Sequence, residues 1–396
     1  MLRRKFVQRL SKTTQTTIAL IAIMLALSAC FNAGNDVYRL DGSRQSIESL
    51  DESISSLLEQ GNVAGLSYAI INDFKVVHVG AYGYRDLQTR VPNDPKTSFS
   101  AASLSKTVFA YIVVTLAEDG LLDLDEPVQT YLERPLETYD NYVDLRGDDR
   151  AGKITARMVL SHTSGLPNWR FMLADEKLAI LFEPGTKYSY SGEGYVLLQM
   201  VVEEITGIKL EDLAEQIVFG PIGMTNTSFV WNDEYEENYA EPHSETGKKK
   251  KLPRRLVADA AGGMQTTAAD YAAFVVEVMQ RARDGDPVVE RMIRPQIPVS
   301  SQAVQSPRQH DESDLETTAA VSWSLGWGSF ESKSGKAIFH TGNNPGYINY
   351  SIAFLDAGSG IVMLSNSENF SRVVSSIGRT AIGDVYSPYS WLGFDE

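Results

Sequence analysis

The sequence predicts an α+β fold, in which an antiparallel sheet is flanked by helices and interrupted by a mostly helical inserted region. Strand-like runs occur near both ends of the chain, at residues 65–71, 75–83, 336–342, 347–356 and 360–367. Between them, from about residue 103 to 320, apolar residues mostly recur at helical spacing. Strands at both ends with helices between them indicate one sheet that the returning chain completes.

The composition is that of an acidic globular protein. The 396 residues are 43% hydrophobic, which is sufficient for one large domain or two ordinary ones. The formal net charge is −15, and five of the 36 basic residues lie in the first 29 residues, so the rest of the chain is more acidic still. We therefore expect no nucleic-acid partner.

Residues 1–29 have the pattern of a secretory signal, a basic start followed by an apolar run too short to span a bilayer comfortably. The run ends Leu-Ser-Ala-Cys at Cys30, the only cysteine, which excludes an internal disulfide. This ending resembles the bacterial lipobox, which implies a lipid anchor on Cys30 and a place in the bacterial envelope, facing the periplasm. An uncleaved signal anchor is the alternative.

The chain is predicted to divide into four parts. The predicted divisions are the signal at 1–29, a linker at 30–45, a folded domain at 46–386 and a tail at 387–396. Within the domain, a sheet region at 46–102 and 321–386 encloses a helical region at 103–320. Residues 46–61 repeat with helical period and end at Gly61, and Asn72-Asp73-Phe74 joins the first two strands as a hairpin.

The stretch SFSAASLSKTVFAYIVVTLAEDG, residues 98–120, places Ser103 and Lys106 three positions apart in a predicted helix that Gly120 ends. At that spacing the two side chains lie one turn apart on one face, so the ammonium can reach the hydroxyl. A serine activated by a neighbouring base is a nucleophile. The alternative is an ordinary capping hydroxyl and an ordinary surface cation, since so short a motif also occurs by chance.

Further helices and loops follow. Helices are predicted within 154–169, 194–207, 260–285 and 373–382. The run Lys248–Lys251 follows an acidic stretch, so we expect a solvated, charge-balanced loop rather than a phosphate or membrane patch. The polar tract 298–320 is predicted to be a mobile loop. Loops 231–255 and 296–320 are expected to shape the substrate pockets, but carry no readable code for the substrate.

Three separated stretches could supply the chemistry of acyl transfer, which needs a nucleophile, groups that move protons and N–H donors for an oxyanion. They are SLSK at 103–106, YSYSGEG at 188–194 and HTGNNPGY at 340–347. With SHTSGLP at 161–167, PIGMTNTSF at 221–229 and AAGGMQTTAADYAAF at 260–274, they give the chain its likeness to a known family. From about residue 46 to 385 it resembles the serine beta-lactamase and penicillin-binding protein superfamily, nearest its class C, carboxypeptidase and esterase branch.

The resemblance implies a beta-lactamase/transpeptidase-like fold and a role for each matching residue. Ser103 would be the nucleophile, Lys106 and Tyr190 would share the proton transfers, and the backbone N–H groups of Ser103 and Asn343 would form the oxyanion hole. Substrate-binding positions would be His340, Thr341, Gly342 and Gly192. The helix start at Ser103 would also favour developing negative charge. Tyr190 taken alone could equally be a packed core tyrosine.

Two positions depart from the lactamase pattern. His340 stands where lactamases carry a lysine that meets the substrate carboxylate, and a histidine with an ordinary pKa of ~6.5 would be only partly charged at neutral pH. Gly192 stands where an asparagine usually contacts the substrate amide. Glu193 is expected either to compensate or to face solvent. Both departures weaken the expectation of a lactam or D-alanyl-D-alanine substrate.

The preferred hypothesis is a serine hydrolase that forms an acyl-enzyme on Ser103, releases it to water and acts on an ester or amide of a neutral or modestly polar acyl group, with at most slow hydrolysis of beta-lactams. Its expected partner is a small-molecule ester or amide or a peptide. One alternative is a D-alanyl-D-alanine carboxypeptidase or another peptidase on peptidoglycan stems. Another is a non-catalytic envelope protein that keeps the fold for binding.

No metal or cofactor is expected, because the histidines at 78, 162, 243, 310 and 340 fall on different segments without paired ligand spacing. His162 is expected to support a turn. The sequence carries no indication of oligomeric state.

Overall fold

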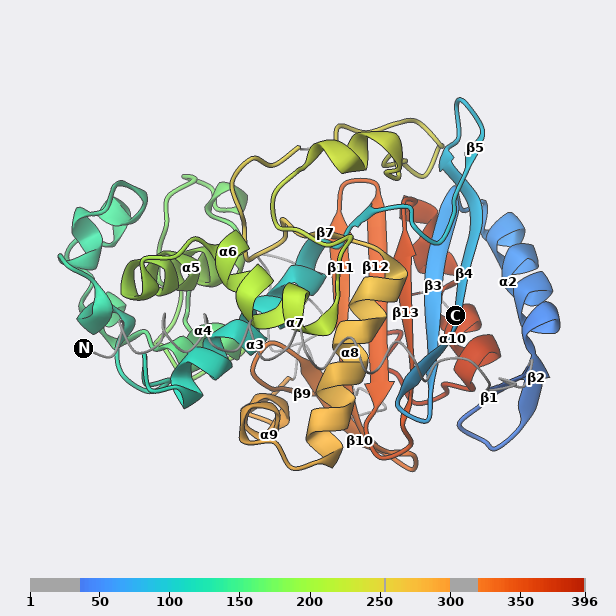
Figure 1. Ribbon diagram of the computed structural model, residues 1–396. Coiled ribbons are helices and arrows are strands. Elements are labelled where there is room, and N and C mark those ends of the chain that lie inside the picture. The colour runs from blue at the N-terminus through green and yellow to red at the C-terminus, as the bar shows by residue number, and fades with distance from the viewer. Residues whose placement is uncertain (1–35, 253, 300–319, 395–396) are drawn as a thin grey trace.

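A nine-stranded antiparallel sheet organises the computed structural model, which describes residues 36–394 without residue 253 and residues 300–319 (Figure 1). The strand order is β5-β4-β3-β13-β12-β11-β10-β9-β8. The strands are β3 (Gly65–Asn72), β4 (Lys75–Asp86), β5 (Val91–Pro92), β8 (Ile297–Pro298), β9 (Ser322–Trp323), β10 (Gly328–Ser332), β11 (Gly335–Asn344), β12 (Tyr347–Phe354) and β13 (Ser359–Ser365).

A strand from the first part of the chain pairs with a strand from the last part in the interior of this sheet. β13 pairs with β3 in antiparallel register, with Leu66 opposite Ser365, and the Ser365 hydroxyl donates a hydrogen bond to the Gly65 carbonyl at 2.7 Å. The prediction of one sheet completed by chain return is therefore confirmed. The short strand β8, which lies in the region predicted to be helical, forms the far edge of the sheet.

The predicted hairpin at the start of the sheet is also confirmed. β3 and β4 are joined by Asp73 and Phe74, whose φ angles are 48° and 58°. Two left-handed residues form the turn whose twist matches that of the flanking strands. The Gln280 side chain donates to the Phe74 carbonyl at 2.9 Å, which ties this turn to the helix that covers the sheet there.

One face of the sheet is covered by α2 (Ile47–Gly61) and α10 (Val374–Ile382), as Figure 1 shows. The Ser46 hydroxyl caps α2 by accepting from the Ser49 N–H. Leu50, Ile54 and Leu58, spaced four apart, form the buried stripe of α2.

Both ends of the described chain complete this face, so the described parts of the predicted linker and tail, residues 36–45 and 387–394, pack onto the domain. β1 (Asp36–Tyr38) pairs with β2 (Arg44–Ser46), and Val37 is fully buried. Tyr389, Trp391 and Phe394 are also buried, in the same core as Val37. Burial of these apolar side chains in the core favours the ordering of both segments.

The opposite face carries α8 (Ala268–Arg283), and α3 (Ser105–Glu118) runs through the helical region beyond it (Figure 1). α3 is apolar nearly all round, which is the pattern of a helix buried on every side. The remaining α-helices are α4 (Ala156–Leu160), α5 (Gly192–Thr206), α6 (Leu210–Ala214), α7 (Gly220–Ile222) and α9 (Pro287–Ile293).

Short elements connect these helices. The single-turn and irregular helices are η1 (Ala102–Leu104), η2 (Val128–Tyr131), η3 (Leu136–Thr138), η4 (Asp140–Leu145), η5 (Asp149–Lys153), η6 (Arg170–Met172), η7 (Glu215–Phe219), η8 (Asp233–Glu237) and η9 (Glu368–Arg372). A small two-stranded sheet pairs β6 (Phe99–Ser100) with β7 (Gln265–Thr266). This pairing brings the segment before Ser103 beside the segment before α8.

The basic run in the 231–255 loop is charge-balanced, as predicted. The Lys249 ammonium lies 2.8 Å from an Asp86 carboxylate oxygen, and the Arg254 guanidinium lies 2.6 Å from Glu236. The tract at 298–320, predicted to be a mobile loop, lies almost entirely outside the described residues.

Candidate active site

Ser103 lies in η1, directly before α3, rather than inside the α-helix itself. Ala102 has a φ of +49°, a left-handed conformation that turns the chain sharply into the helix. The Ser105 hydroxyl stabilises this turn by donating to the Ala102 carbonyl at 2.6 Å and accepting from the Met264 N–H at 3.1 Å. Ser103 is thereby held half-buried at the positive end of α3.

Lys106 makes the contact that the spacing predicted. Its Nζ donates to Ser103 Oγ at 3.1 Å and to the Ala261 carbonyl at 2.5 Å, and only 1% of its surface is exposed. Burial lowers the pKa of this ammonium to about 7, although the Asp259 carboxylate opposes the change. A lysine that loses its proton near neutral pH can act as the base for Ser103.

Tyr190 lies against Lys106, just before α5. The Lys106 Nζ is 4.9 Å from the centroid of the Tyr190 ring. Burial raises the pKa of the Tyr190 hydroxyl, and the nearby Ser103 hydroxyl partly opposes that rise. The Tyr190 oxygen nevertheless makes no hydrogen bond of good geometry with the residues that the structure describes. Tyr190 is therefore a protonated phenol that lies beside the Ser103–Lys106 pair.

The end of β11 lies beside the segment that leads to Ser103. A Cβ on Gly342 would stand 2.4 Å from the Ala101 carbonyl oxygen, so only glycine allows this approach. The side chains of Asn344 and Asn349 donate to Ser100 at 3.0 and 2.9 Å. These contacts hold the end of β11, which carries Asn343, beside the segment that leads to Ser103. The oxyanion hole formed by the N–H groups of Ser103 and Asn343 stays a prediction.

The surroundings of His340 contradict the predicted partial charge of this residue. It is fully buried, and its Nδ1 donates to the Thr341 carbonyl at 2.6 Å. Burial, and then the nearby Lys106 charge, lower its pKa to about 3. The expectation of a partly charged histidine at neutral pH is therefore wrong, because the ring is neutral in the folded protein. His340 supplies no cation for a substrate carboxylate.

Gly192 is covered by an aromatic ring that sequence reasoning missed. A Cβ at Gly192 would lie 2.7 Å from Cζ2 of Trp169 and 2.9 Å from the Asn168 carbonyl oxygen. The indole thus occupies the space into which a longer side chain at this position would project. Trp169 carried no sequence signal, because it precedes Gly192 by many residues in an irregular loop.

Glu193 does not face solvent, and its carboxylate is engaged by Arg170. Its carboxylate accepts from Nε and Nη2 of Arg170 at 2.9 and 2.7 Å and from the Arg170 N–H at 3.0 Å. Only 7% of the Glu193 side chain is exposed. This ion pair fixes the Trp169 loop over the first turn of α5.

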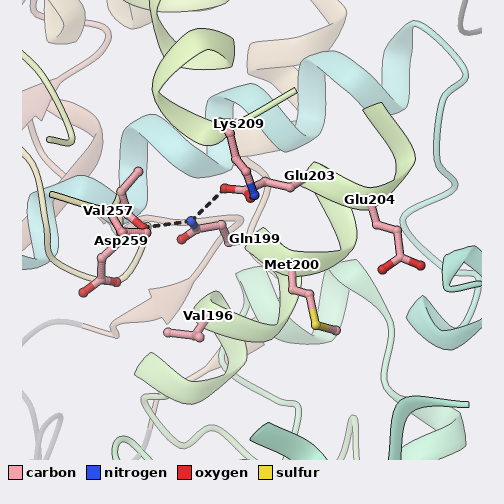
Figure 2. Close-up of a pocket in the computed structure, with 9 residues that line it drawn as sticks. Val196, Gln199, Met200, Glu203, Glu204, Lys209, Val257 and Asp259 are labelled. Carbon is pink, nitrogen blue, oxygen red and sulfur yellow. Dashed lines mark hydrogen bonds and ion pairs between the residues drawn. The ribbon is translucent and has the colours of Figure 1, made fainter. Parts of the chain in front are cut away.

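The segment that leads to Ala261, whose carbonyl accepts from Lys106, also contacts α5. Residues 257–259 of this segment and side chains of α5 line a cavity of about 450 Å³ (Figure 2). Gln199 donates to the Ala258 carbonyl at 2.9 Å and accepts from the Ala260 N–H at 2.8 Å. The lining contains none of the candidate catalytic residues. Gln199 therefore holds the segment that ends in the Ala261 carbonyl, a role that sequence reasoning missed because backbone groups leave no motif.

The described residues contain no group of three or more histidine, cysteine, aspartate or glutamate side chains arranged to hold a metal ion. Over the same residues, no helix has the length and apolar character needed to cross a bilayer. Cys30 and the predicted signal lie outside the described residues.

Comparison with known proteins gives a family match over most of the chain. The family model described as Beta-lactamase matches residues 50–380. Protein flp of Staphylococcus aureus (strain COL) is 23% identical over 342 residues, which are 82% of this chain and 64% of that protein, less than two thirds of its length.

Two solved structures share the fold. D-alanine carboxypeptidase AmpC from Burkholderia cenocepacia has a TM-score of 0.67 at 22% identity, over 85% of this chain and 98% of that one. A class C beta-lactamase has a TM-score of 0.68 at 20% identity, over 86% and 96%. At these identities the likeness shows the beta-lactamase/transpeptidase fold.

Proposed function

The chain belongs to the beta-lactamase family, whose members are serine hydrolases, and from this premise we propose that it forms an acyl-enzyme on Ser103 and releases the acyl group to water. The observation that carries the proposal is the hydrogen bond of 3.1 Å between Lys106 Nζ and Ser103 Oγ, made by a lysine whose pKa is lowered to about 7. A surface lysine with an ordinary pKa would be protonated and could not accept the serine proton.

The proposed reaction has two halves. As Ser103 Oγ attacks the carbonyl carbon, its proton passes to neutral Lys106, and negative charge on the carbonyl oxygen faces the N–H groups of Ser103 and Asn343. The proton then passes to the leaving oxygen or nitrogen by way of Tyr190, and the bond to the leaving group breaks. Water attacks the acyl-enzyme, gives up a proton to the same pair, and restores the Ser103 hydroxyl.

We propose an ester or amide with a neutral acyl group as the substrate. Neutral, buried His340 offers no charge to a substrate carboxylate, and the indole of Trp169 lies where an amide-binding side chain would project from Gly192. Beta-lactams and D-alanyl-D-alanine peptides both carry a free carboxylate and should therefore react slowly.

Two other functions compete with this proposal. The structural likeness to a D-alanine carboxypeptidase supports a peptidase on peptidoglycan stems, but only at the level of the fold. The hypothesis of a non-catalytic envelope protein is disfavoured by the buried Lys106, because burying an ammonium opposes folding and a binding protein has no need of it.

The deciding experiment exposes the purified domain to a short-chain activated ester, a fluorophosphonate and a penicillin, and follows the intact mass. We expect the fluorophosphonate to add once, on Ser103, and the ester to turn over much faster than the penicillin. Efficient penicillin hydrolysis with the ester untouched would place the protein with the lactamases. A chain that none of the three reagents modifies would favour the binding function.

We also propose that the protein is anchored in the bacterial envelope through a lipid on Cys30. The proposal is supported by the Leu-Ser-Ala-Cys ending of the apolar run. Cys30→Ser should abolish incorporation of radiolabelled fatty acid and move the protein from the membrane fraction to the soluble fraction. Equal labelling of the variant would show that the anchor lies elsewhere, and retention in the membrane without label would indicate an uncleaved signal anchor.

A further inference from the structure

His162, in the loop after α4, contacts Tyr190 and both of its neighbours. The Ser189 N–H donates to the His162 carbonyl at 2.7 Å, and the Ser191 N–H donates to His162 Nδ1 at 3.0 Å. Between these two hydrogen bonds, the imidazole ring lies on the phenol ring of Tyr190, with centroids 4.1 Å apart and planes inclined by 34°. One residue thus holds the backbone on both sides of Tyr190 and one face of its ring.

We infer that His162 is a positioning residue for Tyr190, setting the direction of the phenol hydroxyl toward Ser103 and Lys106 without touching the substrate. The inference rests on the proposed function, because it concerns the proton path of that reaction. It goes beyond the expectation of a turn-supporting histidine, since the side chain and not only the backbone of His162 makes the contacts.

The conformation of His162 is costly, which argues that its contacts are needed. Its φ is +57°, a left-handed value that side-chain-bearing residues rarely adopt, and its ring is fully buried. Burial first, and then the nearby Lys106 and His340, lower its pKa well below the usual value, so the ring is neutral. Because Nδ1 accepts a hydrogen bond, the ring hydrogen is on Nε2.

Further aromatic rings also pack against the imidazole. The centroids of Tyr195 and Trp323 are each 5.3 Å from that of His162, and Trp323 also packs edge-on against Tyr190. The Tyr190 oxygen makes no good hydrogen bond with the described residues, so ring packing and the two backbone bonds set its direction. Loss of the imidazole should free the phenol to rotate away from the Ser103–Lys106 pair.

The test is a double-mutant cycle between positions 162 and 190. His162→Asn removes the ring but keeps an oxygen that can accept from the Ser191 N–H, and asparagine tolerates the left-handed backbone. Tyr190→Phe removes only the hydroxyl. The two single variants and the double variant are measured with an activated p-nitrophenyl ester, using the pre-steady-state burst so that slow variants remain measurable.

We expect His162→Asn to lower the acylation rate by about 10- to 100-fold, as loss of an orienting group does, with little change in KM. In the Tyr190→Phe background the same substitution should change the rate less than about twofold, because the group through which His162 acts is gone. A merely structural role would lower the rate by a similar factor in both backgrounds, and that result would overturn the inference. So would an unchanged rate in His162→Asn.

Two further variants serve as a replacement for His162→Asn and as a control. His162→Gly removes both the ring and the acceptor and adopts a positive φ without strain, so it should show the same non-additivity if His162→Asn does not fold. His78→Asn is the matched control, since His78 is a half-buried histidine bonded to Asp51 at 2.9 Å on the α2 side of the sheet. It should lower Tm but leave acylation unchanged. If Tyr190→Phe and Ser103→Ala both hydrolyse the ester at the wild-type rate, the proposed function fails, whatever His162 does.

Discussion

Ser103→Ala should lower ester hydrolysis by several orders of magnitude, roughly 10⁴-fold or more, because it removes the proposed nucleophile. The measurement is kcat/KM for a p-nitrophenyl ester, together with intact-mass labelling by a fluorophosphonate. Labelling should disappear completely. Tm should change little, because Ser103 is half-buried and its hydroxyl bonds only to Lys106 among the hydrogen bonds that the structure describes.

Thr115→Ala is a suitable control for this variant. It removes a hydroxyl from the far part of the same helix, where Thr115 donates to the Tyr111 carbonyl at 2.8 Å. The control should keep both labelling and hydrolysis. Unchanged hydrolysis in Ser103→Ala would remove the acyl-enzyme mechanism and favour a non-catalytic role.

Lys106 should impose a pH dependence on the same reaction. Its pKa is lowered to about 7, so the fraction of neutral lysine rises steeply as the pH increases through 7. kcat/KM should therefore increase about tenfold per pH unit below pH 7 and level off above about pH 8. His162 and His340 do not compete for this assignment, since burial holds both of their pKa values below the range in question.

Two variants test whether this inflection belongs to Lys106. Asp259→Asn removes a carboxylate that favours the charged ammonium, so the inflection should move to lower pH. Lys106→Ala should cost nearly as much activity as Ser103→Ala, and the double variant should cost no more than Ser103→Ala, because the two residues act as one unit. A profile that is flat between pH 6 and 8, or one that Asp259→Asn leaves in place, would exclude Lys106 as the titrating base.

Local patterns predicted those parts of the site that depend on local geometry. A spacing of three residues in the helical turn that leads into α3 brings Lys106 to Ser103, and the hairpin turn at Asp73 and Phe74 follows from two strand-like runs separated by three residues. The left-handed Ala102 that moves Ser103 out of α3 was not predictable. It depends on a contact between Ser105 and Met264, which lie far apart in sequence.

The charge of His340 and the surroundings of Gly192 depend on packing rather than on pattern. A histidine keeps its ordinary pKa in water, and only the folded sheet shows that this ring is fully buried near Lys106. The sequence showed that Gly192 departs from the lactamase pattern, but it did not show that the indole of Trp169 packs against this glycine. That indole is held in place by the pairing of Arg170 with Glu193, two residues without a shared motif.

The pairing of β3 with β13 also governs how the protein can fold. The bond between Ser365 and Gly65 closes a loop of 300 residues, so the central strands cannot pair until nearly the whole chain is available. Ordering so long a loop precedes most of the stabilisation that the sheet provides, which slows folding and leaves unpaired strand edges exposed meanwhile. Synthesis of the first strands thus does not commit the chain to its fold. The site around Ser103 forms only when β11, near the other end of the chain, reaches the sheet.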